Sequence, residues 1–558
     1  MCLKVETQFL LLELASPAAP GHGGETTEAS DGGKKTVAAD EDDAGSPCFA
    51  VILPLVSGAF RASLKSSENG DDLVLLCVES GDSAVRATCV ENAVFVAAGS
   101  DPFQLLERSF QAVADRLQTF RVRTAKEAPP TLDCFGWCTW DAFYSEVDGA
   151  GILAGVRSLR EVGTPARTLI IDDGWQDATL PEQTVTTGSG LRRGCSPSCA
   201  SSTARSTSSN FSERLLGKAD RRADPRVAGW QDLGVRSVYC WHTLSGYWSG
   251  GPRGALASAR EGHVWHPKPF PGVLQVDPGV AWHPLTLNEV QLPPVEQAGE
   301  MFEKVHAFLA SSGVDGVKVD GQATLTMLGS DAGGSAALTR GFVHALEGSV
   351  EKHFGGAQCI NCMCHPLECF YSYQTTSVAR ASDDFWPRDP ASHTLHIANV
   401  AYTSVFLAEI VTLDWDMFQS KHPSAMLHAV ARAVGGCAVY VSDNPGNHNP
   451  EVLKRLVLPD GSVYRGLLPG RPTRDCLFVD PTRDGTSALK IWNRNRHTGL
   501  LAAFNLQSSS WDPVHRRSRL LQGRVPAVVA LLRSGGWGFG FEVGNHARLR
   551  CFEAASLP

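Results

Sequence analysis

Charged residues end several short apolar runs of the sequence. In one of them, residues 314–320, the apolar stretch finishes with Lys318 and Asp320. If this run is a buried parallel strand, the two side chains lie two residues apart and share one face. The carboxyl tips of such strands are where α/β folds place their chemistry. Other runs end in the same way, with Trp140 and Asp141, Asp172, Asp173 and Trp175, Trp241 and His242, Arg380, Asp383 and Asp384, Asp414, Trp415 and Asp416, and Asp443.

The residue types at these ends suit a neutral polyhydroxyl ligand. Carboxylates accept hydrogen bonds from sugar hydroxyls, and the indole face of Trp covers the C–H side of a sugar ring. We predict that Trp140, Asp172, Asp173 and Trp175 bind the sugar. No glycine-rich phosphate loop follows any of the runs, and the paired cysteines do not have the spacing of a zinc site. We therefore expect neither a metal ion nor a cofactor.

Two carboxylates on facing strands suit glycosyl transfer by double displacement. One acts as the nucleophile and the other as acid and then base, with the two groups about 5–5.5 Å apart. We predict Asp320 as the nucleophile, because Lys318 on the same face favours its ionised form. The acid/base is Asp383 or Asp384, since crowding of adjacent carboxylates raises one pKa. Arg380 is close enough in sequence to stabilise the other carboxylate.

The elements that must position these residues alternate between strand-like and helix-like segments. Eight apolar runs, separated by helical patterns, span roughly 310 residues, which favours a (β/α)8 TIM barrel with insertions. One predicted helix covers residues 152–161, and another carries an apolar stripe over residues 295–309. A doubly wound open sheet is the alternative fold within the α/β class. The predicted strands are 132–140, 168–173, 236–241, 316–320, 358–362, 377–382, 409–413 and 437–442.

The barrel is predicted to be flanked by two β-rich parts. The sequence changes character near residues 48, 129 and 450, where β-like runs give way to the alternating pattern and then return. A Ser- and Arg-rich stretch shows neither helical nor strand periodicity. The predicted parts are a flexible segment at 1–47, an antiparallel β module with a helix at 48–128, the barrel at 129–450 with an irregular insertion at 187–225, and a C-terminal β domain at 451–558 with strands near 477–479, 488–492 and 500–504.

Composition limits the partners and the compartment. A net charge of −9 without a basic face argues against nucleic acid, whose binding depends on phosphate neutralisation. The apolar run 9–12 is too short to span a bilayer, and it lacks the basic lead-in of a signal peptide. Most of the 16 cysteines lie within apolar runs, as expected of reduced, buried thiols. We expect a soluble cytoplasmic protein with no membrane partner.

Four long and rare strings occur at the predicted strand ends. They are residues 135–144 (FGWCTWDAFY), 170–176 (IIDDGWQ), 380–386 (RASDDFW) and 413–418 (LDWDMF). In these strings the chain resembles the plant raffinose synthase/alkaline α-galactosidase family, which belongs to glycoside hydrolase family 36. The resemblance extends from about residue 48 to residue 505.

The resemblance implies a (β/α)8 barrel and retaining chemistry on α-galactosides without a metal. Matched motif by motif, Asp320 would be the nucleophile and Asp383 the acid/base, with Asp384 as the second choice. The implied sugar contacts are galactose hydroxyls at Asp172 and Asp173, ring oxygens at Lys318 and Arg380, and ring stacking on Trp140.

Two activities occur in this family. Some members are galactosyltransferases that make raffinose from galactinol and sucrose, and others are hydrolases known as seed imbibition proteins. Residues 433–437, 442–448 and 468–475 look more like the imbibition-protein branch. We therefore predict an alkaline α-galactosidase that cleaves raffinose-like α-1,6-galactosides, with the galactinol–sucrose galactosyltransferase as the alternative. An inactive sugar-binding relative and an unrelated structural protein are further alternatives.

Overall fold

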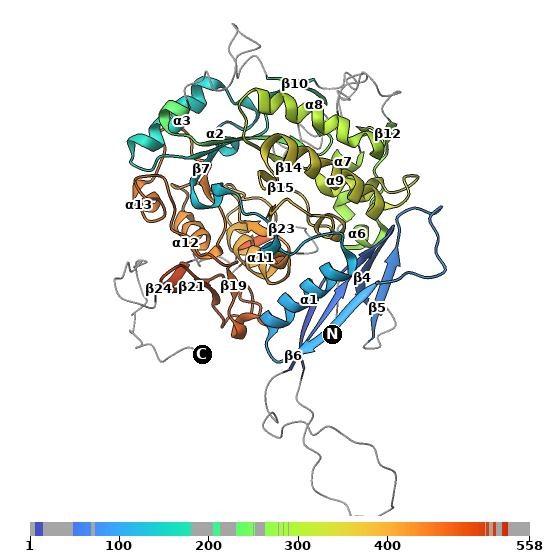
Figure 1. Ribbon diagram of the computed structural model, residues 1–558. Coiled ribbons are helices and arrows are strands. Elements are labelled where there is room, and N and C mark those ends of the chain that lie inside the picture. Colours follow the sequence, from blue (N-terminus) through green and yellow to red (C-terminus); the bar gives the residue numbers. More distant parts are fainter. Residues whose placement is uncertain are drawn as a thin grey trace, which may run out of the picture.

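A parallel sheet of eight strands forms the centre of the molecule (Figure 1). The strands were analysed in a computed structural model, which describes residues 6–14, 48–67, 73–179, 205–211, 230–248, 250, 263–276, 278–282, 284–287, 289–507, 509–512, 517–520 and 527–533. All eight predicted runs form strands of this sheet, most of them with shorter bounds than predicted. They are β7 (Phe135–Cys138), β8 (Thr168–Ile171), β11 (Ser237–Thr243), β14 (Gly316–Asp320), β15 (Cys359–Asn361), β16 (Val378–Arg380), β17 (Thr412–Asp414) and β18 (Val439–Val441).

The sheet closes into a barrel. Neighbouring strands follow chain order from β7 to β17, and β18 returns to lie beside β7, with Tyr440 opposite Gly136. On its other side β18 meets the segment after β17 through a bridge between Val441 and Phe418. A last strand that pairs with the first distinguishes a barrel from an open sheet. The predicted (β/α)8 fold is therefore confirmed over the doubly wound alternative.

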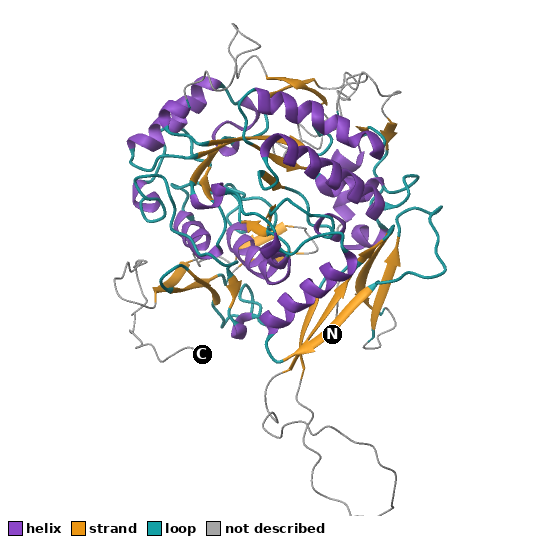
Figure 2. Ribbon diagram, in the orientation of Figure 1, coloured by secondary structure: helices purple, strands orange, loops and turns teal. Residues whose placement is uncertain are grey.

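Helices surround the barrel (Figure 2). On β14, Val317 and Val319 pack outward with Phe302 of the helix layer, so Lys318 and Asp320 point into the barrel. The predicted helix at 152–161 is α3 (Gly149–Glu161), capped by Asp148. The stripe at 295–309 begins on the 3-10 helix η8 (Val295–Gln297) and continues on α8 (Ala298–Ser311). The other helices are α2 (Trp140–Phe143), α6 (Pro271–Val276), α7 (Pro284–Leu287), α8 (Ala298–Ser311), α9 (Ser335–Phe354), α10 (Leu367–Phe370), α11 (Ser392–Phe406), α12 (Ala425–Gly435) and α13 (Pro450–Leu453).

Two small antiparallel sheets and one helix form the N-terminal module. β1 (Leu10–Leu14), β2 (Cys48–Pro54) and β6 (Val94–Gly99) make one sheet, and β3 (Val56–Ser57), β4 (Phe60–Ser66) and β5 (Val74–Glu79) the other. The helix α1 (Pro102–Leu117) begins at the cap Asp101. The β-rich character predicted for 48–128 is confirmed. Part of the segment predicted as flexible, 1–47, instead forms β1, because its leucines pair along β2; residues 15–47 lie outside the described part.

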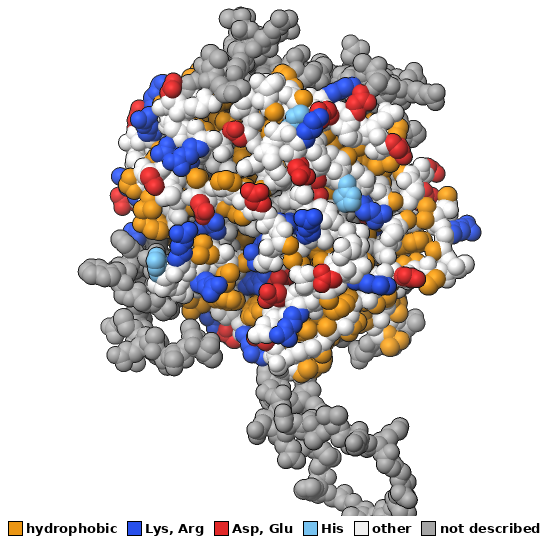
Figure 3. Space-filling view, viewed as in Figure 1, with side chains coloured by type: hydrophobic (Ala, Val, Ile, Leu, Met, Phe, Trp, Pro, Cys, Tyr) orange, Lys and Arg blue, Asp and Glu red, His pale blue; other side chains and the backbone are white. Residues whose placement is uncertain are grey.

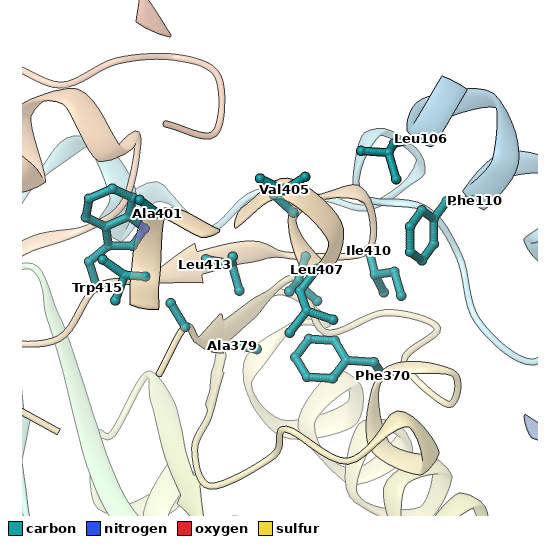
Figure 4. Packing of buried hydrophobic residues seen from close by; sticks show 14 of the residues in the cluster. Leu106, Phe110, Phe370, Ala379, Ala401, Val405, Leu407, Ile410, Leu413 and Trp415 are labelled. Atoms are coloured by element: carbon teal, nitrogen blue, oxygen red, sulfur yellow. The ribbon is translucent and has the colours of Figure 1, made fainter. Parts of the chain in front are cut away.

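The N-terminal module packs on the barrel through α1. Figure 4 shows Leu106 and Phe110 of α1 beside Leu407 and Ile410, which follow α11. All four side chains are buried in one hydrophobic cluster. Burial of this kind of apolar surface contributes about 25 cal/mol per Å². The module and the barrel therefore share one core.

The C-terminal part is antiparallel, as predicted. β19 (Arg471–Pro472), β20 (Leu489–Arg494), β21 (Gly499–Asn505) and β24 (Ala527–Arg533) make one sheet, and β22 (Ser509–Asp512) pairs with β23 (Arg517–Leu520). The predicted strand at 477–479 is wrong. Leu477 and Val479 instead follow the 3-10 turn η11 (Arg474–Cys476) and pack against the core from there.

Two hairpin-like pairs lie outside the main sheets. β9 (Gln176–Thr179) pairs with β10 (Arg205–Phe211), so part of the insertion predicted as irregular at 187–225 forms a strand. The remainder of that insertion lies outside the described residues. The second pair joins β12 (His263–Trp265) to β13 (Val290–Leu292).

The surface in Figure 3 carries Lys and Arg side chains interspersed with Asp and Glu side chains. In the described part of the chain, no helix combines the length and the apolar character needed to cross a membrane.

Candidate active site

Lys318 and Asp172 form an ion pair inside the barrel. Lys318 Nζ lies 2.7 Å from Asp172 Oδ2, and both side chains are buried. Burial lowers the pKa of the Lys318 ammonium, but the Asp172 charge outweighs this effect and holds the pKa well above its ordinary value. From the sequence, Lys318 is predicted to stabilise the ionised form of Asp320. The structure instead pairs it with Asp172, 146 residues away in the chain.

Asp320 is oriented by two N–H donors at the tip of β14. Its Oδ1 accepts from the Gly321 backbone N–H at 2.7 Å, and its Oδ2 accepts from Trp241 Nε1 at 3.1 Å. Trp241 belongs to β11, where it lies opposite Lys318 in the parallel register. The carboxylate is thus held at the barrel mouth by donors that carry no charge.

Asp173 is bound by two aromatic side chains that the sequence argument missed. Tyr247 OH donates to Oδ1 at 2.9 Å and Trp248 Nε1 to Oδ2 at 3.3 Å. Both residues follow β11, and an aromatic pair directly after a strand end was the available signal. Gly174 has φ +113°, and a Cβ there would lie 2.6 Å from the backbone oxygen of Ser145, so this turn requires glycine.

The two predicted sugar-binding tryptophans occupy different places. Trp140 begins α2 directly after β7, is partly exposed, and meets Tyr144 edge to face at 5.3 Å between ring centroids. Trp175 is fully buried among residues of the strands and helices, and its indole N–H donates to Trp241 O at 2.6 Å. A fully buried ring offers no face to a sugar. The assignment of Trp175 to the sugar is therefore wrong, and this side chain packs in the barrel wall.

Arg380 gathers three carboxylates on the opposite side of the mouth. It lies 2.6 Å from Asp384, 3.2 Å from Asp414 and 2.8 Å from Asp416. Tyr440 OH donates to Asp414 at 2.7 Å. Burial raises the pKa of Asp416, but Arg380, Lys318 and the Phe385 N–H together lower it below its ordinary value.

The two candidate acid/base carboxylates differ in their surroundings. The Asp384 side chain is 52% exposed to the mouth. The protein around it disfavours the charged form, and Asp416 and Asp383 add negative charge, so its pKa rises to about 7 despite Arg380. Asp383 is exposed, and its carboxylate accepts from the Asp384 N–H at 2.9 Å and from Trp386 Nε1 at 3.3 Å.

The buried thiol of Cys362 lies near charged groups from both sides of the mouth. Burial raises its pKa, as do the charges of Asp320 and Asp384, whereas Arg380 and Lys318 lower it. Two charged groups of β14 and two from β16 and the loop after it thus lie within electrostatic reach of one buried atom. Asp141 lies within electrostatic reach of Asp416 and Asp172. Burial raises its pKa to about 7, and its carboxylate accepts from Ser442 Oγ at 2.6 Å.

Three of the strand-end residues do not join the site. His242 pairs with His306 of α8 at 3.2 Å between their Nε2 atoms, and so faces the helix layer. Trp415 is fully buried in the hydrophobic core. Asp443 accepts from Ser420 and His448, and so connects two loops. Within the described residues, no three His, Cys, Asp or Glu side chains are arranged to hold a metal ion.

Comparisons with known proteins agree on one family. The family described as "Raffinose synthase or seed imbibition protein Sip1" matches residues 2–538. The chain is 42% identical to "Probable galactinol–sucrose galactosyltransferase 6" of Arabidopsis thaliana, over 95% of this chain and 67% of that protein. It is 37% identical to "Galactinol–sucrose galactosyltransferase" of Pisum sativum, over 84% and 61%. A "Stachyose synthase" of Pisum sativum is 30% identical, over 84% and 65%. The chain thus spans about two thirds of the length of these relatives.

Two solved structures are similar to the chain at low identity. One is an α-galactosidase of Thermus thermophilus in complex with stachyose, with 18% identity and a TM-score of 0.41 over 73% of this chain and 76% of that one. The other is a glycoside hydrolase family 36 α-galactosidase of Geobacillus stearothermophilus, with 12% identity and a TM-score of 0.46 over 89% and 63%. Because both scores are low, the barrel assignment rests on the strand register.

The names of the relatives bear on the two activities considered from the sequence. They favour the galactosyltransferase, which was the alternative, over the α-galactosidase preferred from the motifs. The match along nearly the whole chain leaves no ambiguity about descent. The chain belongs to the raffinose synthase/seed imbibition protein family.

Proposed function

We propose that this chain is a retaining galactosyltransferase that moves a galactosyl group from galactinol to sucrose. The proposal rests on the names of its relatives and on one structural observation. Asp320, oriented by Gly321 and Trp241, lies in the same charged network as Asp384, a carboxyl with a pKa near 7. A fixed nucleophile and a nearby proton donor are what double displacement requires.

In the first step, one Asp320 oxygen attacks the anomeric carbon of the galactosyl group. The bond to the leaving alcohol breaks, and the acid/base carboxyl gives its proton to the departing oxygen. Asp172 and Asp173 are then the proposed acceptors for galactose hydroxyls, with Lys318 and Arg380 near the ring oxygens. Their positions are fixed beforehand by ion pairs and aromatic donors, which favours catalysis by preorganisation.

Two neighbouring carboxylates compete for the acid/base role. The family motif favours Asp383. The raised pKa of Asp384 favours Asp384, because a general acid must hold its proton near neutral pH. Asp383 has a different use in this proposal: its hydrogen bond to Trp386 orients an indole ring beside the acid/base.

The second step decides between transfer and hydrolysis. Water reaches any open intermediate, so an acceptor sugar wins only if it is bound close to the galactosyl-enzyme. Trp386 is 38% exposed, a large fraction for an indole, and it is tied to Asp383. We assign to it the apolar platform on which the acceptor stacks. Trp140, also partly exposed, serves the galactosyl group.

The test is product analysis with the purified chain, given either galactinol with sucrose or raffinose alone. The proposal predicts a new trisaccharide from the first mixture, together with little galactose from the second. Galactose release from raffinose without any trisaccharide would instead establish the α-galactosidase.

A matched pair of variants sharpens this assay. Trp386→Ala should shift the products from trisaccharide toward free galactose, because the acceptor loses its platform while Asp320 and Asp384 remain. Phe478→Ala, at a similarly exposed aromatic residue of the C-terminal part, should leave the product ratio unchanged. An unchanged ratio in Trp386→Ala would remove the acceptor role of this residue.

A further inference from the structure

A buried arginine and four histidines lie behind the loop that carries the candidate acid/base. Arg432 is on α12, which lies next to α11 (Figure 1). We call the four histidines the histidine cluster: they are His393, His396, His422 and His428. His428 and Arg432 are fully buried, and His393 and His396 are nearly so. The loop in front of them is residues 383–387.

Arg432 fixes which nitrogen of His428 carries the proton. A guanidinium only donates hydrogen bonds, and Arg432 NH1 lies 2.8 Å from His428 Nδ1, so Nδ1 accepts. The proton of neutral His428 is therefore on Nε2, which donates to His393 Nδ1 at 2.9 Å. A second proton on His428 would face a guanidinium directly.

Two other histidines hold the backbone of the loop at its ends. His396 Nδ1 lies 3.1 Å from the Asp383 carbonyl, and its Nε2 lies 3.2 Å from the Trp415 carbonyl and 3.4 Å from Arg432 NH2. In the neutral tautomer whose Nε2 accepts from Arg432, Nδ1–H donates to the Asp383 carbonyl. His422 Nδ1 accepts from the Ser424 N–H at 3.0 Å, so its Nε2–H donates to the Pro387 carbonyl at 3.0 Å. The His422 donor exists in the neutral tautomer that the Ser424 N–H imposes, and the His396 donor exists in the neutral tautomer with its proton on Nδ1.

The centre of the loop is held by Phe385. Its ring is buried and meets His393, His422 and His428 with centroids 4.8–5.6 Å apart. Its backbone N–H donates to Asp416 Oδ2 at 2.7 Å. Phe385 thus connects the cluster to the carboxylates on Arg380.

Arg432 also supports the neighbouring loop after β17. Its guanidinium donates to three consecutive carbonyls, those of Trp415, Asp416 and Met417. Asp416 has a left-handed backbone, with φ +66°, which is costly for a residue other than glycine. One buried cation therefore stabilises a strained turn on one side and the histidine cluster on the other.

We infer that Arg432 and the histidine cluster are positioning residues that hold the loop 383–387, and with it the acid/base carboxylate, in its working place only while the histidines are neutral. The assignment of an acid/base to this loop rests on the proposed function. The support of the loop by the cluster does not.

The inference gives a sign for the effect of pH. Burial lowers the pKa of His396 to about 4, and burial together with His422 lowers that of His393 to about 3. A histidine released from the cluster would bind a proton near pH 6.5. Between about pH 4 and about pH 6.5, histidines released from the cluster bind more protons than histidines within it. Acid therefore favours the state in which the loop is released, and neutral pH favours the state in which the cluster holds it. The charged or titratable groups that face the cluster and Arg432 are Arg380, Asp414, Asp416, Cys437 and Tyr440.

The test is hydrogen exchange of the peptide that contains residues 383–391, measured on the whole chain. In the wild type, exchange corrected for its intrinsic pH dependence should rise as pH falls below about 6.5, while the strand β14 stays protected. His396→Leu should raise exchange of the loop by about tenfold at neutral pH, the usual effect of losing one buried hydrogen bond. His396→Asn, which keeps a donor near the Nδ1 position, should restore protection in part.

A matched variant separates local support from general destabilisation. His306→Leu removes an equally buried histidine that contacts His242 and Ser349 on the other side of the barrel, and it should leave loop exchange unchanged. Equal effects of His306→Leu and His396→Leu, or a wild-type loop whose corrected exchange ignores pH, would overturn the inference. If a leucine variant fails to fold, the wild-type pH series still decides.

Turnover adds a second readout. For an active chain, His396→Leu should lower kcat about 10- to 100-fold through misplacement of the acid/base, with little change in KM for galactinol. A chain that exchanges as expected but shows no transfer refutes the proposed function and leaves the loop support in place. A normal kcat with a mobile loop refutes the link between the two.

Discussion

The two sides of the barrel mouth hold their carboxylates in different ways. On the side of β8, β11 and β14, each carboxylate has its own partners: Lys318 for Asp172, and uncharged N–H or O–H donors for Asp173 and Asp320. On the side of β16 and β17, three carboxylates share the single guanidinium of Arg380. Each side thus has three of these carboxylates and one cation, but on the first side each carboxylate has separate donors, whereas on the second side all three crowd around the cation.

Separate donors fix the orientation of a carboxylate, whereas crowding around one cation favours its protonation. A carboxylate with dedicated donors keeps one position, as a nucleophile requires. Around Arg380, the surrounding protein disfavours the charged form of the partly exposed Asp384, and Asp416 and Asp383 add negative charge, so its pKa rises to about 7 and it retains a proton. The same residue type therefore serves two purposes because its surroundings differ.

The largest expected effect comes from removing the oriented carboxylate. Asp320→Asn keeps the shape of the side chain and abolishes its nucleophilicity, so transfer from galactinol should fall by at least about 10⁴-fold. Product chromatography over long incubations measures this loss. Galactose binding by calorimetry should persist in the variant. If turnover of Asp320→Asn stayed within about tenfold of the wild type, Asp320 would not be the nucleophile, and the proposed difference between the two sides would be wrong.

The side of β16 and β17 is tested by replacing its two exposed carboxylates, Asp383 and Asp384, one at a time. Asp384→Asn should lower kcat by about 10²–10⁴-fold with galactinol, the range for loss of a general acid. With a galactoside whose leaving group needs no protonation, the Asp384→Asn variant should regain much of the rate of the first step. Asp383→Asn should cost less and should mainly affect acceptor use, through Trp386. The reverse ranking would return the acid/base role to Asp383.

The barrel could be predicted from the sequence because its strands are short, buried and separated by helices. All eight runs were identified, since apolar stretches bounded by charged ends are a local pattern. The helices at 152–161 and 295–309 were found for the same reason. Isolated errors arose where apolar residues pack from a turn, as in Leu477 and Val479, or where pairing with a distant strand decides, as in β1.

The partners within the site could not be predicted in the same way. Lys318 lies two residues from Asp320, yet strand register brings it to Asp172. Trp175 lies close in sequence to two sugar-binding candidates, but its side chain packs in the barrel wall, where its indole N–H donates to Trp241 O. Such choices depend on contacts between strands far apart in sequence, which local spacing does not contain. The motif resemblance points to particular strand ends and contains no information about their pairing.

A smaller effect tests whether uncharged donors matter on the side of β8, β11 and β14. Trp241→Phe removes the N–H that reaches Asp320 and keeps an aromatic ring, so kcat/KM for galactinol should fall about tenfold, the value of one hydrogen bond to a charged group. Trp175→Phe is the matched control, because it removes an indole N–H in the barrel wall. We expect it to lower the melting temperature with less than a twofold change in kcat/KM. Equal kinetic losses in both variants would mean that wall packing, and not the donor, sets the activity.

The smallest effect is on stability, because the proton on Asp384 makes the free energy of unfolding depend on pH. The pKa of Asp384 is raised from the ordinary 3.8 to about 7, so between these values the folded chain binds the proton that the unfolded chain has lost. The stability of the wild type must therefore decline as pH rises through this window, relative to a variant that cannot ionise. As pH rises from about 4 to about 7, the unfolding free energy of Asp384→Asn, measured by urea titration, should gain on that of the wild type by no more than about 1 kcal/mol, because the side chain is half exposed. Parallel midpoints across that range would mean that Asp384 holds no proton at neutral pH, and the crowding around Arg380 would then have to be relieved at another carboxylate.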